Sequence, residues 1–191
     1  MEAFLVSFGA VAVAEIGDKT QLLALILAVR FRAPIAVIGG IFVATVANHA
    51  LAAFAGTLIA GWLTPGILAW VLAISFILMG LWTLVPDDAP SDEETAAASR
   101  FGAFMATAIA FFLVEMGDKT QFATVALGAR YEALLAVSFG TTLGMMAANV
   151  PVVLFGRALA ERIPAKVMRF AAALIFIALG LIGAATALAL I

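Results

Sequence analysis

The 191-residue sequence contains no cysteine, a single histidine and few charged residues. Without cysteine, the chain has neither disulfide bonds nor thiolate metal ligands. Only 12% of its residues are charged and 65% are hydrophobic, whereas soluble domains have about 25% charged and about 45–50% apolar residues. This composition and a mean hydropathy of +1.19 exclude a disordered chain and argue against a soluble domain. They predict a protein that crosses a membrane several times.

The balance of charge argues against nucleic acid as a partner. Lysine and arginine total 10 and aspartate and glutamate total 12, so the formal net charge is −2 and there is no basic excess for nucleic acid. The chain opens with Met1 and Glu2 rather than with basic residues, and Glu15 and Asp18 interrupt its first apolar run. We interpret this run as a retained membrane span and not as a cleaved signal peptide.

Six apolar segments are long enough to cross a bilayer, which takes about 20 residues of helix. They are Ala3–Val29, Ile35–Ala60, Pro65–Val85, Phe101–Ala129, Ala133–Leu159 and Ala165–Leu190. The predicted fold is an all-α integral membrane protein with six transmembrane helices in contact with lipid.

One polar stretch separates these segments into two groups of three. It covers residues 86–100 and holds five acidic residues: Asp87, Asp88, Asp92, Glu93 and Glu94. We expect residues 1–85 and 101–191 to form two three-helix repeats, and residues 86–100 to form an acidic, solvated linker between them.

The two halves of the sequence repeat each other. A shift of 100 residues places Glu15-Ile-Gly-Asp-Lys-Thr-Gln21 on Glu115-Met-Gly-Asp-Lys-Thr-Gln121, with six identities in seven positions. No gap is needed further along the chain, and we expect the later coincident glycines to be sites of close helix packing. These are Gly40, Gly56 and Gly80, which fall on Gly140, Gly156 and Gly180.

Three spans per repeat is an odd number, so the second repeat should face the opposite way to the first. The positive charges support this arrangement, because cytoplasmic loops collect lysine and arginine. One side of the predicted bundle receives only Arg130, and the other receives Arg30, Arg32, Arg100, Arg157, Arg162, Lys166 and Arg169. We expect the second of these sides, with the acidic linker, to be cytoplasmic and both termini to lie outside. Inverted repeats are typical of secondary transporters, which bind substrate near the membrane midplane.

Each copy of the motif lies near the middle of its span, where a charged residue is costly. Glu15 and Asp18 are three positions apart, so we expect both to point from one face of the helix, with Gln21 three residues further on the same face. Lys19 follows Glu15 by four residues, the favourable order for an ion pair within a helix. Gly17 would permit either close approach of another helix or a local break. The second motif repeats this pattern with Glu115, Gly117, Asp118, Lys119 and Gln121.

The intramembrane charges indicate a cation site. Four carboxylates and two lysine ammoniums leave a net charge of −2, which one divalent cation or two protons would neutralise. Carboxylate, amide and hydroxyl oxygens suit hard cations such as Mn²⁺, Ca²⁺ or Mg²⁺, and a carboxylate in a medium of low dielectric constant also takes up protons. A site that holds either a divalent cation or protons is the core of an antiporter.

A purely structural role is the alternative for these charges. The glutamate–lysine pairs within each motif could pin the helix bundle, but this would leave Asp18 and Asp118 without partners in lipid. Three more polar residues lie in mid-span positions, where they either line the pathway or bond across helices. They are Asn48, His49 and Asn149.

The duplicated Glu-x-Gly-Asp-Lys-Thr motif resembles that of the Gdt-type calcium/manganese:proton antiporter family, which includes bacterial manganese exporters of the MneA type. The resemblance covers essentially the whole chain. Every motif position is kept, namely Glu15, Gly17, Asp18, Lys19, Thr20, Glu115, Gly117, Asp118, Lys119 and Thr120. It implies that the acids of both motifs bind the cation, and that the cation leaves the cytoplasm in exchange for protons. It further implies a multi-pass protein of the bacterial inner membrane without a tightly bound cofactor.

We therefore expect a secondary transporter that exports Mn²⁺, with Ca²⁺ as the next candidate, by alternating access; a homodimer is left open. The motif threonines, lysines and glycines would support the ligands. The expected ligands themselves are oxygen atoms of Glu15, Asp18, Gln21, Glu115, Asp118 and Gln121.

Three other classes of function compete with this interpretation. A divalent-cation channel or uniporter could use the same acidic site, and the proton dependence of flux separates it from an exchanger. An intramembrane aspartyl protease would carry glycine where Glu15 and Glu115 stand. An exporter of amino acids is disfavoured, because a net-negative site repels a carboxylate-bearing substrate.

Overall fold

The computed structural model describes residues 1–85, 102–156 and 165–190, and in these ranges the chain forms α-helices and no strand. The helices are α1 (Glu2–Glu15), α2 (Lys19–Phe31), α3 (Pro34–Trp62), α4 (Pro65–Thr83), α6 (Ala103–Glu115), α7 (Lys119–Tyr131), α8 (Leu134–Phe155) and α10 (Ala165–Ala189). The all-helical class predicted from composition is confirmed. The expected linker at residues 86–100 and the end of the fifth predicted span lie outside the described residues.

Four helices are long and apolar enough to cross a membrane, and they lie in α3, α4, α8 and α10. Large hydrophobic side chains face outward, such as Trp62 and Phe170, whereas carboxylates such as Glu15 and Glu115 are fully buried. This distribution is the reverse of that in a soluble domain, where charged side chains are almost never fully buried. The described part of the chain is therefore built to contact lipid.

The first and fourth predicted spans are not continuous helices, and this corrects the expectation from the sequence. Residues 16–18 separate α1 from α2, and residues 116–118 separate α6 from α7. Each of these four helices has only 13 or 14 residues, which is less than a membrane crossing needs. The apolar pattern alone did not reveal the breaks, because apolar residues continue on both sides of each break.

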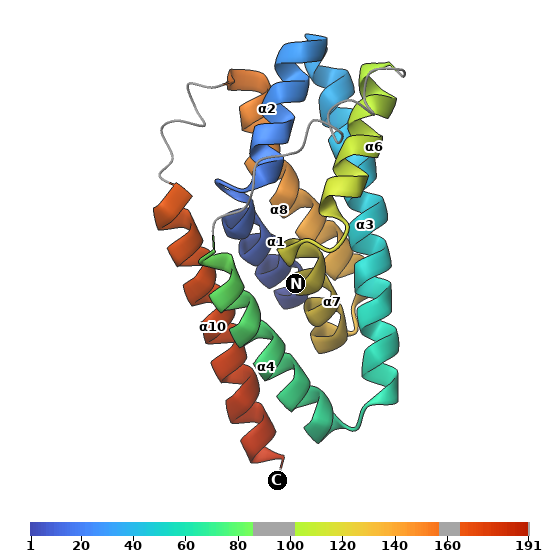
Figure 1. The fold of residues 1–191 in the computed structure, drawn as a ribbon. Helices are drawn as coiled ribbons and strands as arrows, with labels where there is room; N and C mark the ends of the chain where they lie inside the picture. Colours follow the sequence, from blue (N-terminus) through green and yellow to red (C-terminus); the bar gives the residue numbers. More distant parts are fainter. Residues whose placement is uncertain (86–101, 157–164, 191) are drawn as a thin grey trace.

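The helices of the two halves run in opposite directions (Figure 1). The chain rises through α1 and α2 and descends through α6 and α7, and α3 and α8 are likewise opposed. Helices α4 and α10 lie side by side along one flank, while α1 packs on α8 and α6 packs on α3. Each half therefore makes its main contacts with the other half.

These contacts are reciprocal between the two halves. A Cβ added to Gly40 would lie 2.6 Å from the carbonyl oxygen of Phe104, and one added to Gly140 would lie 2.6 Å from that of Phe4. The same pairing therefore occurs twice, with the halves exchanged. In both places the absence of a side chain lets two helix backbones approach closely.

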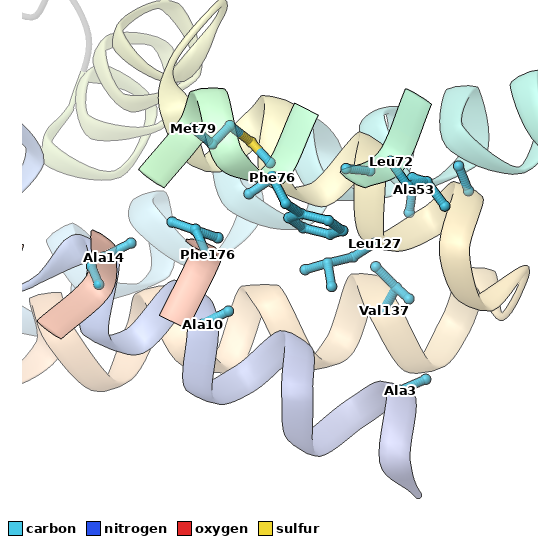
Figure 2. Close-up of a cluster of buried hydrophobic side chains, with 14 of the residues drawn as sticks. Ala3, Ala10, Ala14, Ala53, Leu72, Phe76, Met79, Leu127, Val137 and Phe176 are labelled. Atoms are coloured by element: carbon cyan, nitrogen blue, oxygen red, sulfur yellow. The ribbon is translucent and has the colours of Figure 1, made fainter. Parts of the chain in front are cut away.

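The reciprocity extends to α4 and α10. The equivalent rings of Phe76 and Phe176 stack on each other with their centroids 6.4 Å apart, within the cluster drawn in Figure 2. A residue can contact its own equivalent only at an axis that relates the two halves. The axis that relates the two halves therefore passes between these two rings.

The expected packing role holds for five of the six coincident glycines: Gly40, Gly56, Gly80, Gly140 and Gly180 all meet backbone or side-chain atoms of another helix. It is wrong for Gly156. A Cβ at Gly156 would meet nothing within 4 Å, and this residue instead ends α8 with a φ of 66°.

Candidate metal centre

Each Glu-x-Gly-Asp sequence forms a tight turn between two helices. Ile16 has φ −69° and ψ 116°, Gly17 has φ 82°, and the amide of Asp18 donates to the carbonyl of Glu15 at 3.1 Å. These values match a type II β-turn, which favours glycine at its third position because φ is positive there. Of the two roles open to this glycine, the structure shows the local break.

The second motif repeats the turn. Met116 has φ −66° and ψ 118°, Gly117 has φ 79°, and Asp118 donates to Glu115 at 3.1 Å. In both copies the glutamate is the last residue of one helix and the aspartate is the N-cap of the next. The turn therefore places two acidic side chains at the meeting point of two helix ends.

Threonine hydroxyls tie the two sides of each turn together. Thr20 donates to Oε2 of Glu15 at 2.7 Å, and Thr120 donates to Oε2 of Glu115 at 3.2 Å. Thr120 also lies against Oδ2 of Asp118, through its amide at 3.3 Å and its hydroxyl at 3.4 Å. The motif threonines thus orient the carboxylates.

The two glutamines stabilise the backbone of the turns. Oε1 of Gln21 accepts from the Gly17 amide at 2.9 Å, and Oε1 of Gln121 accepts from the Gly117 amide at 2.7 Å. Their amide groups reach across to the other half, where Gln21 donates to the carbonyl of Ala148 at 2.8 Å. The glutamine oxygens, expected as cation ligands, are therefore engaged by the backbone.

Three acidic side chains converge in the interior. Glu15, Glu115 and Asp118 each offer one oxygen, and these oxygens lie within 4.8 Å of one another. All three residues are buried. Oε1 of Glu15 and Oε1 of Glu115 receive no hydrogen bond from the described part of the chain. A buried acceptor normally has a partner, so these two oxygens are available to a cation or to protons.

The lysines pair across the two halves and not within their own motif. Nζ of Lys19 lies 3.0 Å from Oδ1 of Asp118, and Nζ of Lys119 lies 3.3 Å from Oδ1 of Asp18. This corrects the expected i, i+4 pairs with Glu15 and Glu115. The turn removes the helical spacing on which those pairs depended, and it supplies Asp18 and Asp118 with the partners that a continuous helix would deny them.

The two cross-pairs differ in their access to solvent. The Lys19 side chain is 25% exposed, whereas the Lys119 side chain is 5% exposed. The two motifs differ only at Ile16 and Met116, so this difference arises mainly from the packing around them. The two ion pairs are therefore reciprocal in their partners but not in their exposure.

The mid-span polar residues behave differently from one another. Asn48 donates to the carbonyl of Phe112 at 3.0 Å and accepts from Gln121 at 3.4 Å, so it contacts the second turn. Asn149 donates to the Met145 carbonyl of its own helix. His49 is fully buried, and neither of its ring nitrogens has a hydrogen-bond partner in the described ranges. Of these three, only Asn48 is joined to the motif.

Sequence reasoning missed one participant, the carbonyl of Ala148. Its contact with Gln21 is the counterpart of the Gln121–Asn48 contact, because Ala148 falls on Asn48 under the 100-residue shift. The residue type carries no signal, since the interaction uses the backbone. Only the repeat register could have identified the position.

Comparison with known proteins agrees with this chemistry. A family model described as "Divalent cation/proton antiporter GDT1" matches residues 3–91 and 103–190. A relative from Vibrio cholerae serotype O1, named "Putative manganese exporter", is 51% identical over 182 residues, which cover 95% of this chain and 90% of the relative. No solved structure matches the chain. The chain is thus a membrane transport protein and not an enzyme, and it belongs to the GDT1 family of divalent cation/proton antiporters.

Proposed function

We propose that this protein exports Mn²⁺ from the cytoplasm in exchange for protons, by alternating access at Glu15, Glu115 and Asp118. The observation that carries the proposal is the convergence of these three buried carboxylates, whose oxygens lie within 4.8 Å of one another. Ionised carboxylates at such separations repel strongly in a medium of low dielectric constant. They are stable together only with a cation or with protons.

The donor set fits a hard divalent cation. It offers carboxylate oxygens, with threonine hydroxyls behind them, which is the ligand chemistry preferred by Mn²⁺, Ca²⁺ and Mg²⁺. Asp18 is the fourth carboxylate of the two motifs and adds to the negative charge beside Glu115. The two lysines balance half of the four negative charges, so one divalent cation or two protons complete the neutralisation.

A carrier explains the architecture better than a pore. We infer that α1 with α2 and α6 with α7 each make one crossing, which gives six spans in two inverted repeats. Substrate sites at the meeting point of discontinuous helices are typical of secondary transporters with inverted repeats. The two-fold contacts, such as Phe76 on Phe176, support one half moving against the other around a central site.

The relative supports Mn²⁺ as the cargo, because its name refers to manganese export. The orientation of the protein in the membrane follows from charge. Arg30 lies in the last turn of α2 and Arg32 caps that helix, and Lys166 and Arg169 lie at the start of α10. Cytoplasmic ends collect such residues. We therefore place these helix ends in the cytoplasm and both termini outside.

The experiment is transport by purified protein in liposomes with an imposed pH gradient. Uptake of Mn²⁺ and of Ca²⁺ is followed together with proton movement. We expect the Mn²⁺ flux to depend on the pH gradient and to be accompanied by proton movement in the opposite direction. Because protons and the cation compete for the same oxygens, Mn²⁺ binding should weaken as the pH falls. Metal flux that is unchanged when the gradient is collapsed would indicate a channel or uniporter instead.

A matched pair of variants locates the site. Glu115→Gln removes one charge from the carboxylate cluster and should abolish exchange. Glu132→Gln makes the same chemical change at an exposed position in the same half and should transport as wild type. Equal transport by the two variants would remove Glu115 from the mechanism.

A further inference from the structure

We propose that Lys19 is an internal competitor of the transported cation: its ammonium occupies Asp118 when the site is empty and leaves when the cation binds. This inference rests on the proposed function and adds a step to it. It assigns different roles to Lys19 and Lys119, although the two lysines occupy equivalent positions in motifs that differ only at Ile16 and Met116.

The first argument is the state of each carboxylate oxygen in the cluster. Oε1 of Glu15 and Oε1 of Glu115 receive no hydrogen bond from the described residues. Both oxygens of Asp118, in contrast, are engaged, since Oδ1 contacts the Lys19 ammonium at 3.0 Å and Oδ2 contacts Thr120. A cation that binds all three carboxylates therefore competes with a donor only at Asp118.

The second argument is which donor can leave. The amide of Thr120 belongs to the first turn of α7, so it cannot move away without unwinding that helix. Lys19 holds Asp118 through a flexible four-carbon stem, which can swing while its backbone stays in place. Displacement of the ammonium therefore costs less than displacement of Thr120.

The third argument is where the displaced charge goes. The Lys19 side chain is 25% exposed, so its ammonium can move toward water. The Lys119 side chain is only 5% exposed, and transfer of an ammonium out of its pair into a buried environment is costly. In this conformation Lys19 can be released and Lys119 is retained.

The Lys119–Asp18 pair also has a different position from the Lys19–Asp118 pair relative to the three converging carboxylates. Lys119 contacts Asp18, and Asp18 is not one of the three residues whose oxygens converge. A cation bound by Glu15, Glu115 and Asp118 leaves the Lys119–Asp18 contact in place. Lys19 would return to Asp118 when the cation departs, and this return opposes rebinding.

The test follows the reactivity of the lysine amines. The chain has only three lysines, Lys19, Lys119 and Lys166, and Lys166 is exposed, which makes it an internal reference. Purified full-length protein is acetylated briefly with and without MnCl₂ at constant ionic strength, and each site is quantified by mass spectrometry. Bound Mn²⁺ is measured in the same samples by the loss of the free-ion electron paramagnetic resonance signal.

We expect saturating Mn²⁺ to raise acetylation of Lys19 relative to Lys166 by about threefold or more, because the released population shifts with occupancy. Acetylation of Lys119 should stay constant. If Mn²⁺ binds and Lys19 acetylation stays the same or falls, the competitor role of Lys19 is wrong, while the proposed function stands. If Mn²⁺ does not bind, the proposed function fails and this inference fails with it.

A pair of variants provides a second measurement. Lys19→Met and Lys119→Met each remove one positive charge from the same region, so both should tighten Mn²⁺ binding through electrostatics. Only Lys19→Met also removes a competitor, so its affinity should exceed that of Lys119→Met by about fivefold, the value of a partly exposed ion pair. Equal tightening in the two variants would overturn the proposal.

Discussion

The hydroxyl of Thr20 lies 2.7 Å from Oε2 of Glu15 and joins the first turn of α2 to the last residue of α1. The corresponding contact of Thr120 with Glu115 is longer, at 3.2 Å, and the Thr120 hydroxyl also contacts Asp118. Each carboxylate is thus oriented by a neighbour from across its turn. The positions of the carboxylate oxygens therefore depend on the two turns as well as on the acidic residues themselves.

Thr20→Val should weaken Mn²⁺ binding by about tenfold. The replacement keeps the shape of the side chain but removes the hydroxyl that donates to Oε2 of Glu15, and hydrogen bonds to charged groups contribute about 1.5–3 kcal/mol. Thr20→Ser, which keeps the hydroxyl, should bind nearly as wild type. Equilibrium Mn²⁺ titration measures both, and normal binding by the valine variant would show that the hydroxyl does not matter.

Asp18→Asn and Asp118→Asn should separate stability from binding. Asp118→Asn removes a member of the carboxylate cluster, so it should cause the greater loss of Mn²⁺ affinity. Asp18→Asn removes the negative charge beside the more deeply buried ammonium, that of Lys119, so it should cause the greater loss of stability, about 3 kcal/mol.

The two aspartate variants are compared by titration and by thermal unfolding in detergent. Glu132→Gln, at an exposed position, serves as the control for replacement of a carboxylate by its amide. Equal losses in both measurements for the two variants would mean that the asymmetry between the motifs has no energetic consequence.

Gly117→Ala should destabilise the protein by about 1–2 kcal/mol, the cost of a left-handed conformation for a residue with a Cβ. Gly117 has φ 79°, and a Cβ there would meet nothing within 4 Å, so the effect comes from the backbone alone. Gly61→Ala is the control, because Gly61 is helical and equally uncrowded; that change should be neutral or stabilising. The melting temperatures of the two variants, measured side by side, test this prediction.

Gly40→Ala and Gly39→Ala test the packing between α3 and α6. A Cβ at Gly40 would lie 2.6 Å from a backbone oxygen of Phe104, whereas a Cβ at Gly39 would lie 3.3 Å from the Phe104 ring, which can move. We expect Gly40→Ala to lower stability by about 2 kcal/mol, as overpacking does, and Gly39→Ala to have little effect. Similar melting temperatures for both variants would contradict the close approach of the two helices.

Several features of this protein can be predicted from its residues alone. Composition and hydropathy indicate helices in contact with lipid. Both quantities depend only on which residues are present, so they can be read without a structure. The motif identifies Glu15, Asp18, Glu115 and Asp118 because charge within apolar segments stands out without knowledge of packing. Residue types suitable for a hard cation are likewise readable from the chain.

The break at each motif was only partly predictable. Gly17 and Gly117 indicate a position where the backbone can turn, but glycine also serves close helix packing, as Gly40 does. The positive φ that distinguishes the two roles is a property of the folded backbone. The expected ion pair of Glu15 with Lys19 failed for this reason, because it assumed a helix through the turn.

From the order of residues alone, the repeat and its register follow, because a match of six residues in seven needs no coordinates. The partner of Lys19 does not follow. Lys19 meets Asp118 because reciprocal helix packing brings the start of α2 against the start of α7, and that distance is set by contacts between residues far apart in the chain. The unequal exposure of Lys19 and Lys119 has the same origin, since their motifs differ only at Ile16 and Met116 and the two lysines have different surroundings.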